Sequence, residues 1–209
     1  RLLHYRLNNF RFVSGLRYEK SMQNLHSYTQ TGDKLDVENV YDDFLPAFVL
    51  TYSLNESSNF RFAFSKTLAR PEFREIAPFS YFDFITNEIV IGNKDLKRSK
   101  ISNYDLRYEY YPSLGEIFSI SLFYKSFDKP IEEILLASSG FEPIRSYENS
   151  KSATNYGIEF EVRKNFGFIM STLSNLSFIG NLTLIKSTIK LNNNGFQESK
   201  RALQGQAPW

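Results

Sequence analysis

Apolar and polar residues alternate with a period of two along most of this chain. In residues 60–65 every second residue is phenylalanine, and the positions between hold Arg61, Ala63 and Ser65. Because successive side chains of a β-strand point to opposite sides, this alternation predicts strands with one apolar and one polar face. The pattern occurs in residues 10–19, 44–54, 60–65, 104–110, 118–125, 156–163 and 176–184. A further strand in residues 1–7 would join the first through a turn at Asn8 and Asn9, which makes seven or eight strands in an all-β chain.

The connections between these strands differ in length in a regular way. Residues 55–58 and 112–115 are short links rich in turn-forming residues, whereas residues 20–41, 68–102 and 128–150 are long. Short and long links alternate, so an antiparallel meander places all the long ones at one end. Outer-membrane barrels have this plan, with short periplasmic turns and long extracellular loops. We therefore predict a segment of an antiparallel transmembrane β-barrel. The alternative is a soluble β-sandwich or β-helix whose aromatic face is an ordinary core.

Composition narrows the possible functions. The 209 residues include 25 Lys+Arg and 23 Asp+Glu, a balance that gives no reason to expect a nucleic-acid partner. With 20 Phe and 13 Tyr the chain is too aromatic to be disordered. Cysteine is absent, which excludes a disulfide scaffold and a thiol nucleophile, and no apolar run approaches the roughly 18 residues of a membrane helix.

Four stretches resemble the barrel region of TonB-dependent outer-membrane receptors. They are residues 68–79 (LARPEFREIAPF), 92–125 (from GNKDLKRSK to ISLFYK), 155–164 (NYGIEFEVRK) and 203–208 (LQGQAP). The most similar subgroup carries a carboxypeptidase-regulatory-like N-terminal extension, and the resemblance runs from Phe10 to Pro208. It implies a plugged 22-stranded barrel in the Gram-negative outer membrane, of which residues 1–209 would form a partial domain of about a third. The plug, the energy-coupling box and the terminal aromatic strand of that family are not found here, so we expect an internal fragment.

The function that the resemblance implies is active import of a scarce, bulky nutrient with TonB-coupled energy. The expected partners are outer-membrane lipid and lipopolysaccharide, the TonB energy-transducing complex acting through a region outside this chain, and a small-molecule, glycan or peptide substrate. A passive or adhesive outer-membrane barrel and a soluble carbohydrate-binding β-sandwich are the alternatives.

Catalytic and metal-binding patterns are weak. His4 and His26 are the two histidines, and no G-x-S-x-G elbow occurs, so we predict no enzyme activity. The acidic residues of the first long link could gather around Ca²⁺, although the spacing of a calcium loop with its central glycine is missing. They are Asp33, Asp36, Glu38, Asp42 and Asp43. We predict a solvated acidic loop there, with no metal and no cofactor.

The link 68–102 holds the strongest candidates for ligand binding, because it contains too many aromatic residues for a mobile solvent loop. The candidates are Arg70, Arg74, Phe79, Tyr81, Phe82 and Phe84. On the functional interpretation they line the mouth of the barrel and contact ligand. Alternatively, residues 70–73 form a structural corner that anchors the loop to the barrel wall, and we favour this for the RPEFRE segment.

Two further groups of charges have open roles. Lys94, Lys97, Arg98 and Lys100 could meet lipopolysaccharide phosphates or an anionic ligand, or form an ordinary solvated loop. The lumen-facing charges could bind the plug, or simply pair across neighbouring strands. These are Arg61, Arg107, Glu109, Glu159, Glu161 and Arg163.

Overall fold

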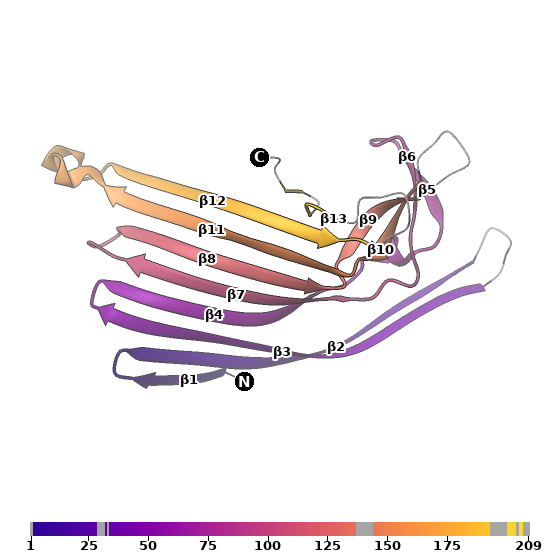
Figure 1. The fold of residues 1–209 in the computed structure, drawn as a ribbon, viewed down its shortest axis with the longest axis horizontal. Helices are drawn as coiled ribbons and strands as arrows, with labels where there is room; N and C mark the ends of the chain where they lie inside the picture. Colours follow the sequence, from indigo (N-terminus) through magenta and orange to yellow (C-terminus); the bar gives the residue numbers. More distant parts are fainter. Residues whose placement is uncertain are drawn as a thin grey trace.

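The computed structural model describes residues 2–28, 32, 34–136, 144–192, 200–203 and 205–206. Nine strands form one open antiparallel sheet in the order β1-β2-β3-β4-β7-β8-β11-β12-β13 (Figure 1). Their bounds are β1 Leu2–Leu7, β2 Phe10–Tyr28, β3 Lys34–Asn55, β4 Ser58–Ala69, β7 Ser99–Tyr110, β8 Ile117–Asp128, β11 Ser152–Asn165, β12 Ser177–Lys190 and β13 Lys200–Arg201. Each predicted strand is present, including the one before the turn at Asn8 and Asn9. In the described ranges no helix is both long and apolar enough to cross a membrane.

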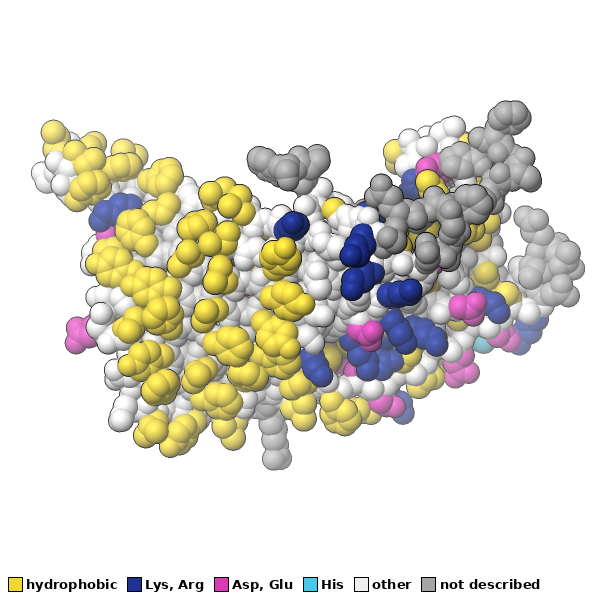
Figure 2. Space-filling model, viewed as in Figure 1, with side chains coloured by type: hydrophobic (Ala, Val, Ile, Leu, Met, Phe, Trp, Pro, Cys, Tyr) yellow, Lys and Arg dark blue, Asp and Glu magenta, His cyan; other side chains and the backbone are white. Residues whose placement is uncertain are grey.

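The strand register places the alternating apolar residues on one common face. Phe48, Phe64, Tyr104, Tyr124 and Tyr156 stand in line across five strands, and we call them the aromatic row. The ring centroids of its first two neighbouring pairs lie 5.4 and 5.1 Å apart, within the range of favourable aromatic contacts. Figure 2 shows this apolar face as a continuous band of hydrophobic side chains.

Within the described ranges no second layer covers the apolar face. Leu106 and Leu122 face each other across β7 and β8 in the middle of the band, yet they are 46% and 52% exposed. Exposing an apolar surface of this extent to water is unfavourable in free energy, because the hydrophobic effect scales with the apolar area in contact with water. The apolar face is therefore suited to a non-aqueous surrounding, and the single layer is not the β-sandwich of the alternative prediction.

All the short connections lie at one edge of the sheet, the short-turn edge, and the long ones lie at the other, the long-loop edge (Figure 1). At the short-turn edge Asn8 has a φ of 48°, a left-handed conformation that asparagine tolerates in a two-residue turn. The link between β11 and β12 is longer and contains two 3₁₀ turns, η1 (Phe166–Phe168) and η2 (Ser171–Leu173). The predicted placement of the tight turns at one edge and of the links 68–102 and 128–150 at the other is confirmed.

The predicted loop of residues 20–41 is mostly strand. β2 continues to Tyr28 and β3 begins at Lys34, and the two remain paired along this whole extension. Polar residues occupy both faces there, so the apolar alternation ends although the ladder of backbone hydrogen bonds continues. Residues 29–31 and 33, which connect the two strands, lie outside the described ranges.

The other two long links fold into a small sheet of their own. The first contains α1 (Phe73–Ile76), β5 (Ser80–Asp83) and β6 (Glu88–Ile91), and the second contains β9 (Ile131–Leu136) and β10 (Ile144–Asn149). The four strands pair in the order β5-β6-β10-β9, and β6 runs parallel to β10. We call α1 and these strands the cap.

Candidate functional site

The corner that leads from β4 into the cap is bonded to β2. The guanidinium of Arg70 donates to Glu19 Oε2 at 2.7 Å and to Ser21 Oγ at 3.1 Å. The side-chain amide of Gln23 donates to the carbonyl of Pro71 at 2.9 Å. The hydrogen bond from Arg70 lowers the pKa of Glu19, so this carboxylate stays ionised. Arg70 therefore makes the contacts of a structural corner, and its role in ligand binding stays a prediction.

Beyond the corner, an open groove of about 500 Å³ lies between the cap and the extension of β2. We call it the cap groove. It is lined by Leu25, Phe73, Arg74, Ala77, Phe79 and Tyr81. The single turn of α1 is closed by the backbone N–H of Glu72, which donates to Glu75 Oε2 at 2.8 Å. This turn projects Phe73 and Arg74 into the groove, while Ile76 on its other side is fully buried.

The cap groove combines aromatic surface with one cation. The guanidinium of Arg74 lies 5.3 Å from the centre of the Tyr81 ring, a cation–π contact. Behind Tyr81, burial raises the pKa of the Tyr147 hydroxyl to about 12, and a hydrogen bond with Tyr81 adds to the shift. The Tyr147 phenol therefore remains neutral at physiological pH. Flat rings beside a guanidinium suit a ligand that has ring faces and a negative group.

The structure divides the six predicted ligand residues into three places. Arg74, Phe79 and Tyr81 meet in the cap groove, whereas Arg70 is bonded to the wall. Phe82 and Phe84 form a separate edge-to-face pair with ring centroids 5.0 Å apart at the tip of the β5–β6 hairpin. Leu25, Phe73 and Ala77 complete the groove. Phe73 was predicted only as part of the structural corner, and the approach of Leu25 was not predicted because it depends on tertiary folding.

The cap has a small core and its own ion pairs. Val90 and Leu96 are almost fully buried there. Arg145 of β10 forms salt bridges with Glu88 of β6 and, at 3.5 Å, with Glu133 of β9. These contacts link both long connections across the parallel pair, so the cap is a folded platform rather than two independent loops.

Asn149 joins three of the long connections. Its side chain accepts from the backbone N–H of Lys97 at 2.7 Å and donates to the carbonyls of Lys97 and Lys129 at 2.8 and 2.9 Å. Its own carbonyl accepts from the side-chain amide of Asn192, which follows β12, at 3.0 Å. One asparagine in β10 thus bonds the segments after β6, β8 and β12 to one another.

The four predicted anion-binding cations do not form one patch. Arg98 lies 4.0 Å from the centre of the Tyr41 ring and makes a 2.8 Å salt bridge with Asp43, whose alternating position puts it on the polar face. Lys94 and Lys97 are exposed in the link before β7. Lys100 instead shares the apolar face with the aromatic row, four residues beyond Tyr104.

Lys100 has outward-facing neighbours that were not predicted. Lys66 on β4 pairs with Ser102, and Lys186 on β12 pairs with Tyr156. With Lys190 these lysines lie just beyond the end of the apolar band, and we call Lys66, Lys100, Lys186 and Lys190 the lysine belt. All four are exposed, and none makes a salt bridge within the described residues. Figure 2 shows basic side chains gathered where the apolar band ends.

The polar face carries a chain of ion pairs across the strands. Arg61 and Arg107 both bind Glu109 at 3.0 Å, and Arg107 also binds Glu161 at 2.6 Å. Glu109 is buried, so these pairs compensate for its desolvation. This favours cross-strand pairing for these four predicted lumen charges. Glu159 and Arg163 make no salt bridge with the described residues.

The acidic residues proposed as a possible calcium cluster point to separate partners. Asp36 binds His26 and Lys34, each at 2.7 Å, and Asp42 accepts from the Tyr18 hydroxyl at 2.5 Å. Asp33 lies outside the described residues. Among the described residues no group of three His, Asp or Glu side chains is placed to hold a metal ion.

Taken together, these features define a class of protein. An open arc with an uncovered apolar face, a charged opposite face, short turns at one edge and folded connections at the other is the wall of an outer-membrane β-barrel. The sequence profile of the family described as "TonB dependent receptor-like, beta-barrel" matches residues 2–208. The chain belongs to this family.

Solved structures share the fold at low sequence identity. A mutant of the ferric enterobactin receptor PfeA from Pseudomonas aeruginosa, in complex with enterobactin, is 16% identical with a TM-score of 0.59. The match covers 90% of this chain and 29% of that one. The siderophore receptor PirA from Pseudomonas aeruginosa is 12% identical with a TM-score of 0.52, covering 87% of this chain and 36% of that one.

A heme receptor shares the same fold. The HasR double mutant of Serratia marcescens, in complex with its hemophore HasA and heme, is 11% identical with a TM-score of 0.54. The match covers 86% of this chain and 38% of that one. No curated protein matches the sequence.

Family membership orients the arc. In outer-membrane barrels short turns face the periplasm and long loops face the exterior. The apolar face is therefore lipid-facing, the short-turn edge is periplasmic, and the cap is extracellular. The aromatic row marks the extracellular boundary of the apolar band, where aromatic girdles occur.

Proposed function

We propose that this chain forms part of the wall and the extracellular loops of an outer-membrane active transporter that imports a scarce, bulky nutrient with TonB-coupled energy. The observation that carries the proposal is the folded cap with its groove, held above a lipid-facing wall of the TonB-dependent receptor family. A passive pore has no need of a rigid, aromatic-lined groove at its mouth, whereas a receptor that must capture a dilute ligand does.

The groove supports a ligand with ring faces and at least one negative group. Phe73, Phe79 and Tyr81 offer aromatic surface for stacking, and Arg74 supplies a charge that is held in place by the Tyr81 ring. Ferric siderophores and heme combine rings with negative charge, and the fold neighbours are receptors named for such molecules. Glycans and peptides with acidic groups fit the same surface.

The test uses the full-length receptor on intact cells. A panel of ferric enterobactin, heme, acidic oligosaccharides and acidic peptides is assayed for binding, and then for accumulation with and without a protonophore. Tyr81→Ala is expected to weaken binding of the recognised probe about tenfold, which is the loss of one stacking contact. Phe84→Ala is the matched control, because this exposed ring of the same loop lies outside the groove.

Each result discriminates between functions. Accumulation that the protonophore abolishes supports energy-coupled import. Binding without energised accumulation supports the passive or adhesive barrel. Equal losses in Tyr81→Ala and Phe84→Ala would reject the cap groove as the ligand site.

We also propose that the lysine belt contacts phosphates of outer-leaflet lipopolysaccharide. Its four unpaired ammonium groups lie directly above the lipid-facing band, where anionic headgroups are expected. The sequence predicted contact with lipopolysaccharide for Lys94, Lys97, Arg98 and Lys100. Of these four residues, only Lys100 belongs to the lysine belt. Arg98 is unsuited because Asp43 already neutralises it.

A further inference from the structure

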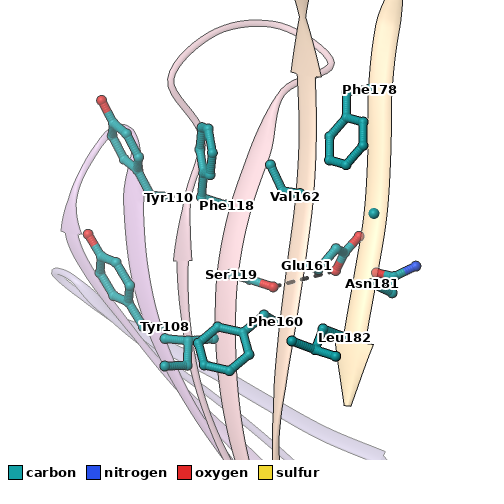
Figure 3. Close-up of a pocket in the computed structure, with 12 residues that line it drawn as sticks. Tyr108, Tyr110, Phe118, Ser119, Phe160, Glu161, Val162, Phe178, Asn181 and Leu182 are labelled. Atoms are coloured by element: carbon teal, nitrogen blue, oxygen red, sulfur yellow. Dashed lines mark hydrogen bonds between the residues drawn. The ribbon is translucent and has the colours of Figure 1, made fainter.

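The lipid-facing wall contains a second open groove, of about 560 Å³, near its periplasmic edge. We call it the wall groove; it lies over β7, β8, β11 and β12 (Figure 3). Its apolar lining comes mainly from Tyr110, Phe118, Phe160, Val162, Phe178 and Leu182. These side chains belong to the alternating set that faces lipid.

Gly180 forms part of the floor of this groove. It lies between Phe178 and Leu182 on the lipid-facing side of β12, opposite Val162. Every other position of that side from Phe178 to Leu184 carries a bulky apolar side chain. A β-carbon at Gly180 would lie 3.0 Å from the Phe178 ring and 3.5 Å from Val162, so a larger side chain would push the Phe178 ring aside and narrow the groove.

The polar residues at the groove turn away from it. Ser119 and Glu161 occupy the opposite phase of the strand alternation and are hydrogen-bonded to each other at 3.4 Å (Figure 3). Glu161 is also bound to Arg107 on the polar face. The side chains of Ser119 and Glu161 therefore offer no partner to a polar ligand in the groove, and the phenol hydroxyls of Tyr108 and Tyr110 are the polar groups left in its lipid-facing lining.

The apolar surface continues beyond the end of the groove into the β11–β12 turn. Phe168, Ile169 and Met170 are 67%, 61% and 58% exposed at the periplasmic edge. The turn is ordered: the side chain of Asn165 accepts from the backbone N–H of Gly167 at 2.6 Å. Lys164, on the lipid-facing side of β11, lies 5.1 Å from the centre of the Phe168 ring, which places this apolar tip beside the membrane-facing surface.

We propose that the wall groove is a discrete binding site for one acyl chain of a phospholipid in the periplasmic leaflet. The groove is continuous with the established lipid-facing surface, its lining is apolar, and the exposed β11–β12 turn extends that surface into the headgroup region of the same leaflet. An acyl chain that lies in this groove makes more van der Waals contacts than one that lies across projecting side chains elsewhere on the lipid-facing wall. The proposal rests on the barrel wall alone and not on what the receptor transports.

The experiment uses the full-length receptor in vesicles of phosphatidylethanolamine that contain a trace of the same lipid with a photoreactive acyl chain. After illumination, the labelled peptides are identified by mass spectrometry. We expect label concentrated on Phe160, Val162 and residues 178–182. Gly180→Leu, which narrows the groove, is expected to lower this label about tenfold.

Ile158→Phe is the matched control, because it adds bulk to the lipid-facing side of β11 outside the groove. It should leave the labelling unchanged. Val162→Phe fills the groove from the opposite strand and serves if Gly180→Leu fails to fold, as judged by its migration with and without heating. Label spread evenly over the lipid-facing strands, or label that persists in both filling variants, would overturn the proposal and leave ordinary annular lipid.

Discussion

The wall and the cap are both built from paired strands, but they use apolar residues in opposite ways. In the wall, Leu106 and Leu122 in the middle of the band are about half exposed, whereas in the cap Ile76 and Val90 are 0% and 1% exposed. The apolar face of the wall is covered by lipid, whereas the apolar side chains of the cap are buried within the cap, away from water. The surroundings that apolar side chains require therefore change from lipid to a protein interior within a few residues of the strand ends.

Charges show the same contrast. In the wall they lie on the polar face and pair across neighbouring strands, as Arg61 of β4 does with Glu109 of β7. In the cap they join segments far apart in sequence, as Arg145 does with Glu88. Ion pairs in the wall follow from strand register, and those in the cap follow from tertiary folding.

The largest effect is expected from opening the cap core. Ile76→Ala removes a fully buried side chain, and we expect it to destabilise the cap by about 2–5 kcal/mol because a cavity remains. Hydrogen exchange of the cap amides in the full-length receptor would measure this, with the wall amides as an internal reference. Ile85→Ala is the control, since Ile85 is almost fully exposed. Equal protection in both variants would mean that the cap has no cooperative core.

A charge on the lipid-facing wall should have a comparable effect on the other region. Leu106→Arg places a cation near the middle of the apolar band, at an expected cost of about 2–4 kcal/mol. Reversible unfolding of the full-length barrel in lipid vesicles would report it. The control is Ile85→Arg in the exposed β5–β6 turn, which should change the free energy of unfolding of the barrel by less than about 0.5 kcal/mol. If Leu106→Arg were equally harmless, the apolar face would not contact lipid.

A smaller effect is expected at the boundary between the two regions. Replacing Lys100 and Lys190 by glutamate should weaken the association of lipopolysaccharide by about 1 kcal/mol for each lysine removed, and more through repulsion. Co-purified lipopolysaccharide, measured by native mass spectrometry, would test this. Lys94→Glu is the control, because Lys94 lies outside the lysine belt. A similar loss in the control would show that net charge matters and not the belt.

The smallest effect is a pH dependence of the corner that joins wall and cap. The hydrogen bond from Arg70 lowers the pKa of Glu19 in the folded protein, so this contact stabilises the fold above the ordinary glutamate pKa. The stabilisation is lost as the pH falls through the lowered folded-state pKa. Hydrogen exchange at residues 69, 70 and 72, expressed relative to the intrinsic exchange rate at each pH, should therefore rise on acidification, and Glu19→Gln should abolish that rise. A rise that persists in Glu19→Gln would assign it to another carboxylate.

The sequence predicts the wall well because one physical rule dominates it. Where one face of a strand meets lipid and the other meets a wet interior, alternation is strong, as in residues 60–65. Above the aromatic row this rule no longer applies. The extension of β2 to Tyr28 was missed because polar residues on both faces remove the alternating signal while backbone pairing persists.

The candidate site was predicted only in part, for a related reason. The aromatic content of residues 68–102 points to the correct segment, but strands as short as β5 and β6 carry too few residues for a reliable period. The partners of Arg98 and Lys100 could not be inferred either, because Arg98 precedes the start of β7 and does not follow the alternation that places Lys100 on the apolar face.

The position of Asn149 has a consequence for exchanging loops between related receptors. Its four hydrogen bonds join the segments after β6, β8 and β12, so these connections form a single structural unit. Grafting one of these loops from a related receptor would break bonds that the other two need, whereas exchanging all three together would preserve them. We therefore expect a variant in which all three connections are exchanged together to fold more readily than one in which a single connection is exchanged.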